Sequence, residues 1–299
     1  MTANFAISSS SMYGFAWISS ARLYHRGARA QRPDCGRFTM RRSRFFVEPS
    51  CIDQENKTIR IEDANQIRQI VTVLRLRPGD ALDVLDGKGN IYPCTLQSSS
   101  ASKGKIRAGD QIICQFESAS PAGGEASVRF SVALPVLRSA RFEWALEKLT
   151  ELGAAEIIPI ILDRSVITYD AEEKLSATKF QRWHSIVREA SEQSERALIP
   201  DVVSPEKFSD FVKRQELVAA TKFIGAERAD AQPINDAISS TSGTKNICIA
   251  IGAEGGFTDE EFALSFTHGF TPISLGKRIL RAETAAVYAA SVLVSRLDK

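Results

Sequence analysis

The segment IGAEGGFTDEEF, residues 251–262, decides the fold class of this 299-residue chain. It follows the apolar run NICIA at residues 246–250 without a break, and Thr258 with Glu261 forms the T-x-x-E pattern that opens many helices. Open α/β sheets bind ligands at the carboxyl ends of their strands, so the loop between strand and helix is predicted to be a ligand site. Its G-x-x-G-G spacing differs from the dinucleotide and P-loop patterns, and taken alone it is also typical of a structural turn. Three glycines fill the loop: Gly252, Gly255 and Gly256.

A second segment, ISLGKRILRAETAAVYAASVL at residues 273–293, carries three cations within five residues. A short strand is predicted to end at Leu275, Gly276 to form a turn, and an alanine-rich helix to follow. The cations therefore lie between a strand end and a helix start, where a phosphate backbone can dock. A charge run of this length is also typical of a solvated surface. The three cations are Lys277, Arg278 and Arg281.

Strands and helices alternate along the chain after Gly124. This alternation predicts an α/β domain over residues 125–299, with a mostly parallel sheet covered by helices on both faces. Helices are predicted from the expected cap Ser139 to Gly153, from about Thr178 to Arg196, and onward from Ser204-Pro205. Apolar runs predict strands at residues 128–137, 156–162, 216–221 and 246–252.

Residues 43–120 contain shorter strands and turns, which predict a small barrel domain. Asp63–Leu74 is predicted as a helix because its apolar residues recur at i, i+3, i+4 and i+7. The RPGD turn at residues 77–80 and the GKGN hairpin at 87–90 enclose an alternating strand. The stretch SASPAGG, residues 118–124, is predicted to link this domain to the next.

Residues 1–42 differ in composition from the rest of the chain. The stretch up to Arg44 contains eight arginines, a single acid at Asp34 and a run of serines at residues 8–11. This composition is typical of a chloroplast or mitochondrial transit peptide. Two alternatives remain open: residues 1–42 are a disordered extension, or the true start is Met40 and the protein is cytoplasmic.

Bulk composition excludes several classes of protein. A hydrophobic content of 43% and a charged content of 25% predict an ordinary globular core. The net charge of +2 provides no global basic field, so any nucleic-acid site must be a local patch. No apolar run approaches the roughly 18 residues that span a bilayer. The five cysteines include no C-x-x-C pair and the three histidines have no metal-ligand spacing, so neither a membrane span nor a metal site is expected.

The two C-terminal segments resemble the signature of the RsmE family, the 16S rRNA uridine-N3 methyltransferases. The resemblance covers about residues 43–297, and the ordered set of motifs is far more specific than any one of them. The further matching segments are SRFFVEP, VLRLRPGDALDVLDGKGNIY, FEWALEKLTELGAAEIIPI and REASEQSER-x-x-IP.

The resemblance implies a fold and a cofactor that composition does not show. The implied catalytic domain is a SPOUT α/β domain with a deep C-terminal trefoil knot, preceded by a PUA-like RNA-binding domain, in an enzyme that forms homodimers. The knot loops would hold S-adenosyl-L-methionine (SAM). The residues at the matching positions are Ile251, Gly252, Glu254, Gly255, Leu275, Gly276, Ile279 and Leu280.

An R-x-E-T element beginning at Arg281 matches the family's motif near the methyl group. Arg281 is expected to stabilise the developing uracil anion, and Glu283 to accept the N3 proton or to hold that arginine. Capping of the last helix is an equally simple role for Glu283. By the same match Arg44, together with Lys277 and Arg278, is expected to bind RNA.

Two positions depart from the family's pattern. Ala253 stands where the first loop usually has proline, and proline would restrict φ there. Gln66 and Gln69 lie in the helix that often carries a histidine in the family. Neither change removes an expected ligand contact.

The expected function is SAM-dependent methylation of N3 of a uridine in small-subunit ribosomal RNA, with free rRNA or the assembled small subunit as the substrate. Two alternatives remain open. The first is a SPOUT methyltransferase that acts on another rRNA or tRNA position, and the second is an RNA-binding ribosome-assembly factor without catalysis.

Overall fold

The computed structural model describes residues 42–101, 106–165, 176–226, 231–241 and 246–298. Residues 42–299 form one compact unit. The predicted transit peptide lies outside the described residues, apart from Arg42. Of the helices in the described ranges, none is long and apolar enough to cross a membrane.

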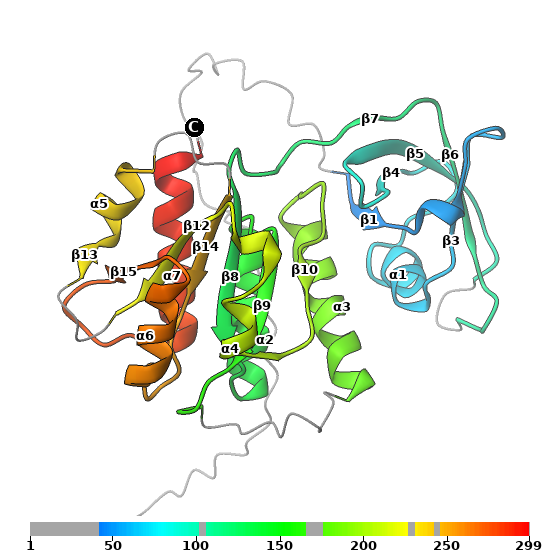
Figure 1. Cartoon of the computed structure of the whole chain (residues 1–299). Coiled ribbons are helices and arrows are strands. Elements are labelled where there is room, and N and C mark those ends of the chain that lie inside the picture. The colour runs from blue at the N-terminus through cyan, green and yellow to red at the C-terminus, as the bar shows by residue number, and fades with distance from the viewer. Residues whose placement is uncertain (1–41, 102–105, 166–175, 227–230, 242–245, 299) are drawn as a thin grey trace, which may run out of the picture. The chain divides into compact units, whose positions relative to one another are not determined.

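An eight-stranded parallel sheet forms the centre of the C-terminal region (Figure 1). Its strand order is β10-β9-β8-β14-β12-β15-β13, and β11 also pairs with β9. All the described pairings are parallel, which confirms the predicted α/β sheet. The strands are β8 (Arg129–Pro135), β9 (Glu156–Ile161), β10 (Asp201–Val202), β11 (Glu206–Lys207), β12 (Thr221–Gly225), β13 (Gln232–Pro233), β14 (Asn246–Ala250) and β15 (Phe270–Ser274).

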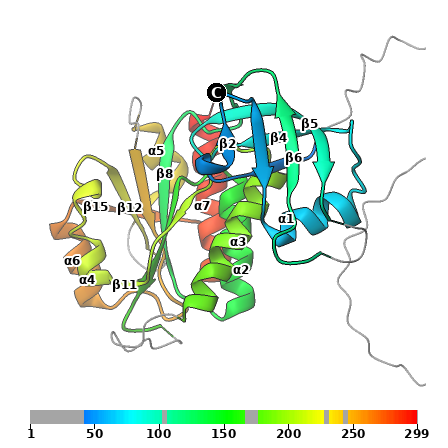
Figure 2. The same cartoon turned by 90° about the vertical axis from the view of Figure 1, so that its right-hand side faces the viewer.

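Helices cover both faces of this sheet (Figure 2). Along β14, Ile247 and Ile249 pack into the core under one helical layer, while Cys248 and Ala250 pack into the core under the other. Burial on both sides is why the run NICIA is continuously apolar. One layer contains α2 (Ser139–Glu151), α3 (Ala177–Gln193), α5 (Ile234–Ser239) and α7 (Ala282–Leu297), and the other contains α4 (Phe208–Phe211) and α6 (Asp259–Thr267).

Helix α2 buries the face that the sequence predicts, but its N-cap residue differs from the predicted one. Phe142 and Leu146 are fully buried, and the Phe142 ring lies 4.5 Å from the Trp183 ring of α3 between centroids. The N-cap residue is Arg138, so Ser139 is the first helical residue and makes no side-chain cap hydrogen bond. The serine at position 139 therefore predicted the start of the helix only to within one residue.

Two elements predicted between α3 and β14 are wrong. Residues 215–217 form a 3-10 turn rather than part of a strand, and β12 begins only at Thr221. β12 lies between β14 and β15 and pairs with both, a long-range constraint that local apolar composition does not reveal. Ser204-Pro205 opens no helix, because β11 first pairs with β9 and α4 begins at Phe208.

The N-terminal region is a separate seven-stranded sheet around its own core. The predicted helix is present: Asp63 caps α1 (Ala64–Arg68), which continues as a π-helix, η2 (Gln69–Val73). Part of the predicted linker, residues 118–124, belongs to this sheet, because its strand β7 pairs with β5. The strand order is β1-β4-β5-β6-β3-β2, with β1 (Arg44–Phe46), β2 (Ile52–Asp53), β3 (Thr58–Ile61), β4 (Ala81–Leu85), β5 (Asn90–Ser99), β6 (Ile112–Phe116) and β7 (Ser120–Pro121), and a 3-10 turn, η1, spans Pro49–Cys51.

The last turn of α3 contacts the N-terminal sheet. The Glu192 carboxylate accepts hydrogen bonds from the Phe46 backbone N–H at 2.9 Å and from Gln66 Nε2 at 3.1 Å. Gln66 also donates to the Phe46 carbonyl at 2.8 Å. Helix α3 ends at Gln193, three residues before its predicted end, because Glu195 adopts a left-handed φ of 61°.

Candidate functional site

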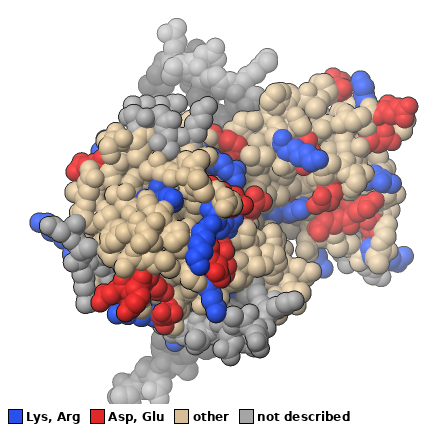
Figure 3. Space-filling model, viewed as in Figure 1, with Lys and Arg blue, Asp and Glu red and all other residues tan. Residues whose placement is uncertain are grey.

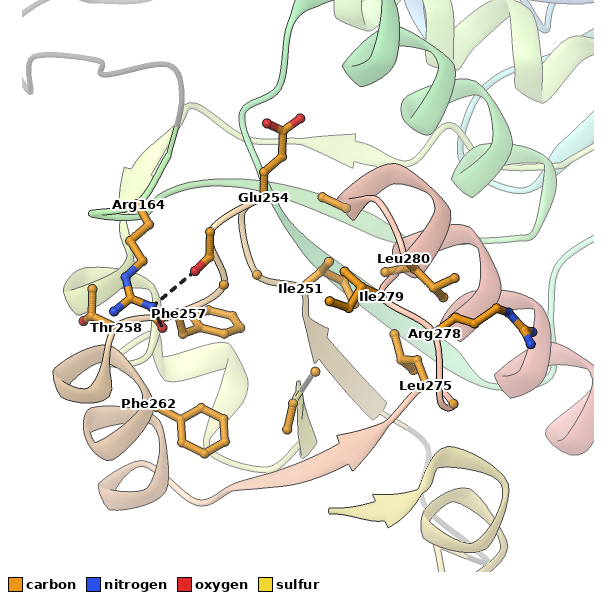
Figure 4. Close-up of a pocket in the computed structure, with 18 of the residues that line it drawn as sticks. Arg164, Ile251, Glu254, Phe257, Thr258, Phe262, Leu275, Arg278, Ile279 and Leu280 are labelled. Carbon is orange, nitrogen blue, oxygen red and sulfur yellow. Dashed lines mark hydrogen bonds between the residues drawn. The ribbon is translucent and has the colours of Figure 1, made fainter. Parts of the chain in front are cut away.

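Three neighbouring parallel strands, β14, β12 and β15, end at one hollow. The segments that follow them, beginning at Ile251, Ala226 and Leu275, line a cavity of about 570 Å³ (Figure 4). Cavities of roughly 300–1,000 Å³ hold small organic ligands. The hollow therefore lies where the sequence places a ligand, at the carboxyl ends of the strands.

The first loop, residues 251–258, is fixed at both of its sides. The predicted capping box is present: Glu261 N donates to the Thr258 hydroxyl at 3.1 Å, and Thr258 N donates to the Glu261 carboxylate at 2.8 Å. Arg164 donates to two carbonyl oxygens of the loop, at 3.2 and 3.0 Å. A side chain at Gly255 would place its Cβ 3.0 Å from the Cβ of Arg164, so glycine permits this close contact.

The second loop, residues 275–281, turns at Gly276, whose φ of +113° favours glycine. Lys277 and Arg278 follow on the surface, and Figure 4 shows the Arg278 side chain directed away from the hollow. Ile279 is 71% exposed at the cavity rim. An aliphatic side chain so exposed beside a cavity indicates a surface that a ligand or partner covers.

The interior combines apolar side chains with glycine backbone. The rings of Phe257 and Phe262 project toward the hollow from one side, and Leu275 and Leu280 face it from the other (Figure 4). Aromatic and aliphatic side chains cover the faces of a flat heterocycle, while exposed loop amides can bond its edge and a polar tail. The cavity thus suits a small ligand with a flat ring and a charged end.

The structure brings the predicted cofactor residues together. Lys277 and Arg278, predicted to bind RNA, line the cavity as well. Arg281 and Glu283 do not line it: Arg281 is the exposed N-cap residue of α7, and Glu283 is buried in the first turn of that helix. All eight expected cofactor residues line the cavity, namely Ile251, Gly252, Glu254, Gly255, Leu275, Gly276, Ile279 and Leu280.

Arg44 is placed elsewhere, on β1 of the N-terminal sheet. Its Nη1 donates to the backbone carbonyl of Glu195 at 2.6 Å, and its Nη2 lies 3.4 Å from the Glu195 carboxylate. Only 19% of the Arg44 side chain is exposed. The guanidinium therefore anchors the N-terminal sheet to the end of α3, whatever contact it makes with RNA.

Arg141, on α2, joins the first loop to the start of α7. Its guanidinium pairs with Glu254 of the first loop, and its Nε lies 3.5 Å from Oε1 of Glu283 at the start of α7. The other oxygen of Glu283, Oε2, is buried and has no hydrogen-bond partner among the described residues. A buried acceptor left unpaired in this way is a place where a further donor can bind.

Sequence reasoning missed five of the contributors to this site. Gly225 and Ala226 were overlooked because the preceding strand was predicted too early, although the run TKFIG ends in a glycine as a strand-to-loop junction does. Phe262 ends the segment 251–262 but was not singled out within it, and nothing local identifies Arg164 or Arg141, since their roles depend on segments distant in the sequence. Arg164, for example, bonds Gly255 across 91 positions.

Charge is unevenly distributed around the site. In Figure 3 acidic side chains gather at the lower left, over α6, whose first turn contains Asp259, Glu260 and Glu261. Acids at a helix N-terminus stabilise it through the helix dipole. The cations Lys277 and Arg278 of the second loop lie at the rim of the cavity, and the Arg278 side chain is directed away from it. Among the described residues no group of three or more side chains could hold a metal ion.

Comparisons with known proteins agree with this geometry. The RNA methyltransferase domain family matches residues 124–294, and the RNA methyltransferase PUA domain family matches residues 61–108. Ribosomal RNA small subunit methyltransferase E of Synechocystis sp. is 32% identical over 255 residues, which cover 85% of this chain and 78% of that protein. The chain belongs to the ribosomal RNA small subunit methyltransferase E family. A member from Bacillus subtilis is 28% identical over 84% of this chain and 95% of its own.

Solved structures of this family share the fold. A Legionella pneumophila methyltransferase with bound cofactor SAM has a TM-score of 0.73 and 28% identity, over 86% of this chain and 98% of that one. Ribosomal RNA small subunit methyltransferase E from Neisseria gonorrhoeae, bound to S-adenosyl methionine, has a TM-score of 0.71 and 25% identity over the same shares. The N-terminal sheet is thereby identified as the PUA-type domain of the family, and the parallel sheet as its methyltransferase domain.

Proposed function

We propose that the protein transfers a methyl group from SAM to N3 of a uridine in small-subunit ribosomal RNA, either as free rRNA or within the assembled subunit. One observation carries this proposal: the loops at 251–258 and 275–281, far apart in the sequence, line a single cavity of about 570 Å³. The SAM-bound relatives and the rRNA named in the curated relatives support the choice of cofactor and substrate.

Methyl transfer from a sulfonium is an in-line displacement. The N3 lone pair of uracil forms the new bond to the methyl carbon as the carbon–sulfur bond breaks, and the N3 proton must leave. The products are 3-methyluridine, S-adenosylhomocysteine and a proton. Because no covalent intermediate is needed, the protein contributes mainly by positioning the two reactants and stabilising the uracil anion.

In this mechanism the first and second loops hold SAM in the cavity. Arg281, exposed at the N-cap of α7, stabilises the negative charge that develops on a uracil carbonyl oxygen. Glu283 accepts the N3 proton or holds the arginine, a role that its unpaired Oε2 supports. Lys277 and Arg278 at the rim, and Arg44 on the N-terminal sheet, contact RNA phosphates.

The proposal includes a deep trefoil knot formed by the two loops and a homodimer. Large apolar side chains support the dimer: Trp144 of α2 is 42% exposed and Tyr288 of α7 is 39% exposed. These two helices pack against each other and, with Ile279 of the second loop, supply apolar surface that a second copy would cover. Light scattering on the purified chain tests this, and a monomer at micromolar concentration contradicts it.

The test of the activity uses purified protein, methyl-labelled SAM and either small-subunit rRNA or assembled small subunits that lack the modification. After digestion to nucleosides, mass spectrometry is expected to show 3-methyluridine. A different methylated nucleoside indicates a SPOUT methyltransferase acting on another position. Bound SAM without any methylated product indicates an assembly factor that has lost catalysis.

Two further assignments are proposals of the same kind. We place the PUA-like domain at residues 43–120 and the methyltransferase domain at residues 125–299. Residues 1–42 direct the protein to a chloroplast or mitochondrion, as their arginine-rich and acid-poor composition supports. A fluorescent protein fused after residue 42 is expected to enter one of these organelles. Diffuse cytoplasmic fluorescence contradicts the targeting role and favours a start at Met40.

A further inference from the structure

An apolar pair protrudes from the N-terminal domain where its helix ends. Ile67 and Ile70 are fully buried in the core of that domain. Three residues after Ile70, Val73 is 69% exposed, and the next residue, Leu74, is 38% exposed. Adjacent large aliphatic side chains that face solvent so fully are not explained by the domain's own packing, so they indicate a surface that binds something.

Three exposed arginines flank this pair. Arg68, Arg75 and Arg77 are exposed, and none forms an ion pair within the described residues. The acid that comes next in the chain, Asp80, already accepts a hydrogen bond from the backbone N–H of Arg77 at 2.8 Å. Three arginines without an ion-pair partner among the described residues therefore surround an apolar centre.

Two acidic residues near the N-terminal end of α1 have partners of their own. The Asp63 carboxylate caps the helix by accepting from the backbone N–H groups of Asn65 and Gln66 at 2.9 Å. The Glu62 carboxylate lies 3.6 Å from the Arg60 guanidinium. Within the described residues, neither carboxylate pairs with Arg68, Arg75 or Arg77.

The backbone holds this pair in a defined position. Leu74 N donates to the Gln69 carbonyl at 2.8 Å and Leu76 N donates to the Ile70 carbonyl at 3.0 Å. Between them Arg75 adopts a φ of +59°, which is uncommon for a residue other than glycine. Leu76 then returns to pack against the core. The fold thus presents residues 73–77, here called the Arg75 turn, as an ordered protrusion rather than as a loose loop.

We propose that the Arg75 turn, with Arg68 beside it, is the surface on which the N-terminal domain grips single-stranded RNA next to the target uridine. The guanidinium groups contact phosphates, and Val73 and Leu74 pack against bases that are not stacked in a duplex. Unpaired RNA fits both features, because a duplex would offer the phosphates while hiding the base faces. This inference rests on the proposed function, since it assumes that the substrate is RNA.

The experiment measures binding of the full chain to a fluorescein-labelled oligouridine of about 20 nucleotides, by anisotropy over a range of salt concentrations and without SAM. Arg75→Ala and Arg77→Ala are each expected to weaken binding several-fold and to reduce the slope of log K against log salt by about 0.7, the value for one phosphate contact with a single strand. Val73→Ser with Leu74→Ser is expected to weaken binding several-fold at every salt concentration and to leave the slope unchanged.

Arg60→Ala provides the matched control. Arg60 is an exposed arginine of the same domain, but it pairs with Glu62, so its removal is expected to change neither the affinity nor the slope. Thermal melting of each variant checks that the domain remains folded. If the Arg75 and Arg77 variants behave like Arg60→Ala, the inference is wrong.

Two further arms separate the possible partners. Annealing the same oligouridine to oligoadenosine is expected to weaken binding, and equal affinity for the duplex contradicts recognition of unpaired bases. Variants that bind RNA normally but no longer bind assembled small subunits indicate a ribosomal protein partner and also contradict the inference. Because SAM is omitted throughout, a failed methylation assay leaves this result unchanged, so the two proposals fail independently.

Discussion

The Glu192 carboxylate on α3 accepts a hydrogen bond from the backbone N–H of Phe46 at 2.9 Å, and so joins the methyltransferase domain to the PUA-type domain. Burial raises the pKa of Glu192 to about 7, although the hydrogen bonds from Phe46 and Gln66 and the nearby Arg188 act in the opposite direction. Glu189 on the same helix adds to the increase. The contact between the two domains therefore contains a carboxyl group that titrates near neutral pH.

This titration predicts a pH dependence of stability. Between the ordinary pKa of 4.5 and the folded-state pKa of about 7, the folded protein keeps a proton that the unfolded chain releases. The free energy of unfolding therefore falls as pH rises through this window, by an amount on the order of 3 kcal/mol, and this contribution is constant at higher pH. Glu192→Gln keeps an acceptor oxygen but cannot ionise, so it is expected to remove this part of the slope.

Urea unfolding at several pH values between these limits measures the effect. Glu189→Gln, which neutralises an exposed carboxylate three residues earlier on α3, is the comparison variant: it is expected to reduce the slope only in part, because it removes the smaller contribution of Glu189 to the pKa of Glu192 and leaves the burial of Glu192 unchanged. Identical pH slopes in the wild type and in Glu192→Gln contradict the prediction. SAM affinity is expected to be unchanged in both variants, because Glu192 contacts the N-terminal domain and does not line the cavity.

The cluster around Arg141 gives a second prediction. Arg141→Ala leaves the Glu283 carboxylate, whose side chain is only 9% exposed, without its positive partner. We expect a loss of stability of about 3 kcal/mol, at the lower end for a buried pair because 28% of the Arg141 side chain is exposed. We also expect weaker SAM binding, since Arg141 holds Glu254 of the first loop.

A double-mutant cycle separates charge from packing. Arg141→Ala combined with Glu283→Gln is expected to be less destabilised than the sum of the single changes, because a neutral amide needs no positive partner. Arg182→Ala is the control: its guanidinium also pairs with a glutamate, Glu143, but the Arg182 side chain is 63% exposed. Equal effects of Arg141→Ala and Arg182→Ala on both stability and SAM affinity contradict a special role for Arg141.

The glycine of the second loop gives a third prediction. A Cβ at Gly276 would meet no atom within 4 Å, so Gly276→Ala acts only through the φ of +113°. Forcing alanine into a left-handed conformation costs about 1–2 kcal/mol or moves the loop.

Gly89, in the GKGN hairpin, has a φ of +96° and equally open surroundings, so Gly89→Ala is a matched control. Calorimetry is expected to show SAM binding that is about 5- to 30-fold weaker for Gly276→Ala alone, the equivalent of this cost. If the two variants bind SAM equally well, the conformation at Gly276 is not needed for the cofactor.

Local patterns predicted the parts of the structure that local physics determines. The apolar run of β14, the capping box at Thr258 and the turn at Gly276 each depend on residues within a few positions of one another, and each is confirmed. The eight predicted cofactor residues came from the resemblance to the family, and they line one cavity because the strands that precede their two loops end at a common edge of a parallel sheet.

The features that sequence reasoning missed depend on distant partners. Arg141 and Glu254 are 113 positions apart, and nothing near either residue indicates that they meet. β12 was misplaced because its apolar run competes with the neighbouring residues 216–220, and only its position between two other strands decides between them. Such pairings between distant residues cannot be predicted from one sequence and become visible only in the folded structure.

The R-x-E-T element provides the last prediction. Arg281 is exposed at the N-cap of α7 and does not line the cavity, so Arg281→Ala is expected to bind SAM with wild-type affinity. Single-turnover methylation of small-subunit rRNA is expected to slow by about 100-fold or more, because the charge developing on the uracil oxygen then lacks its nearest cation. Glu283→Gln is expected to slow the same step, since an amide cannot accept the N3 proton. Arg278→Ala, which removes a neighbouring cation of the same loop, is expected to raise the KM for RNA instead. Single-turnover rates equal to wild type in both Arg281→Ala and Glu283→Gln would remove these residues from the chemical step and leave Glu283 with only its contact to Arg141.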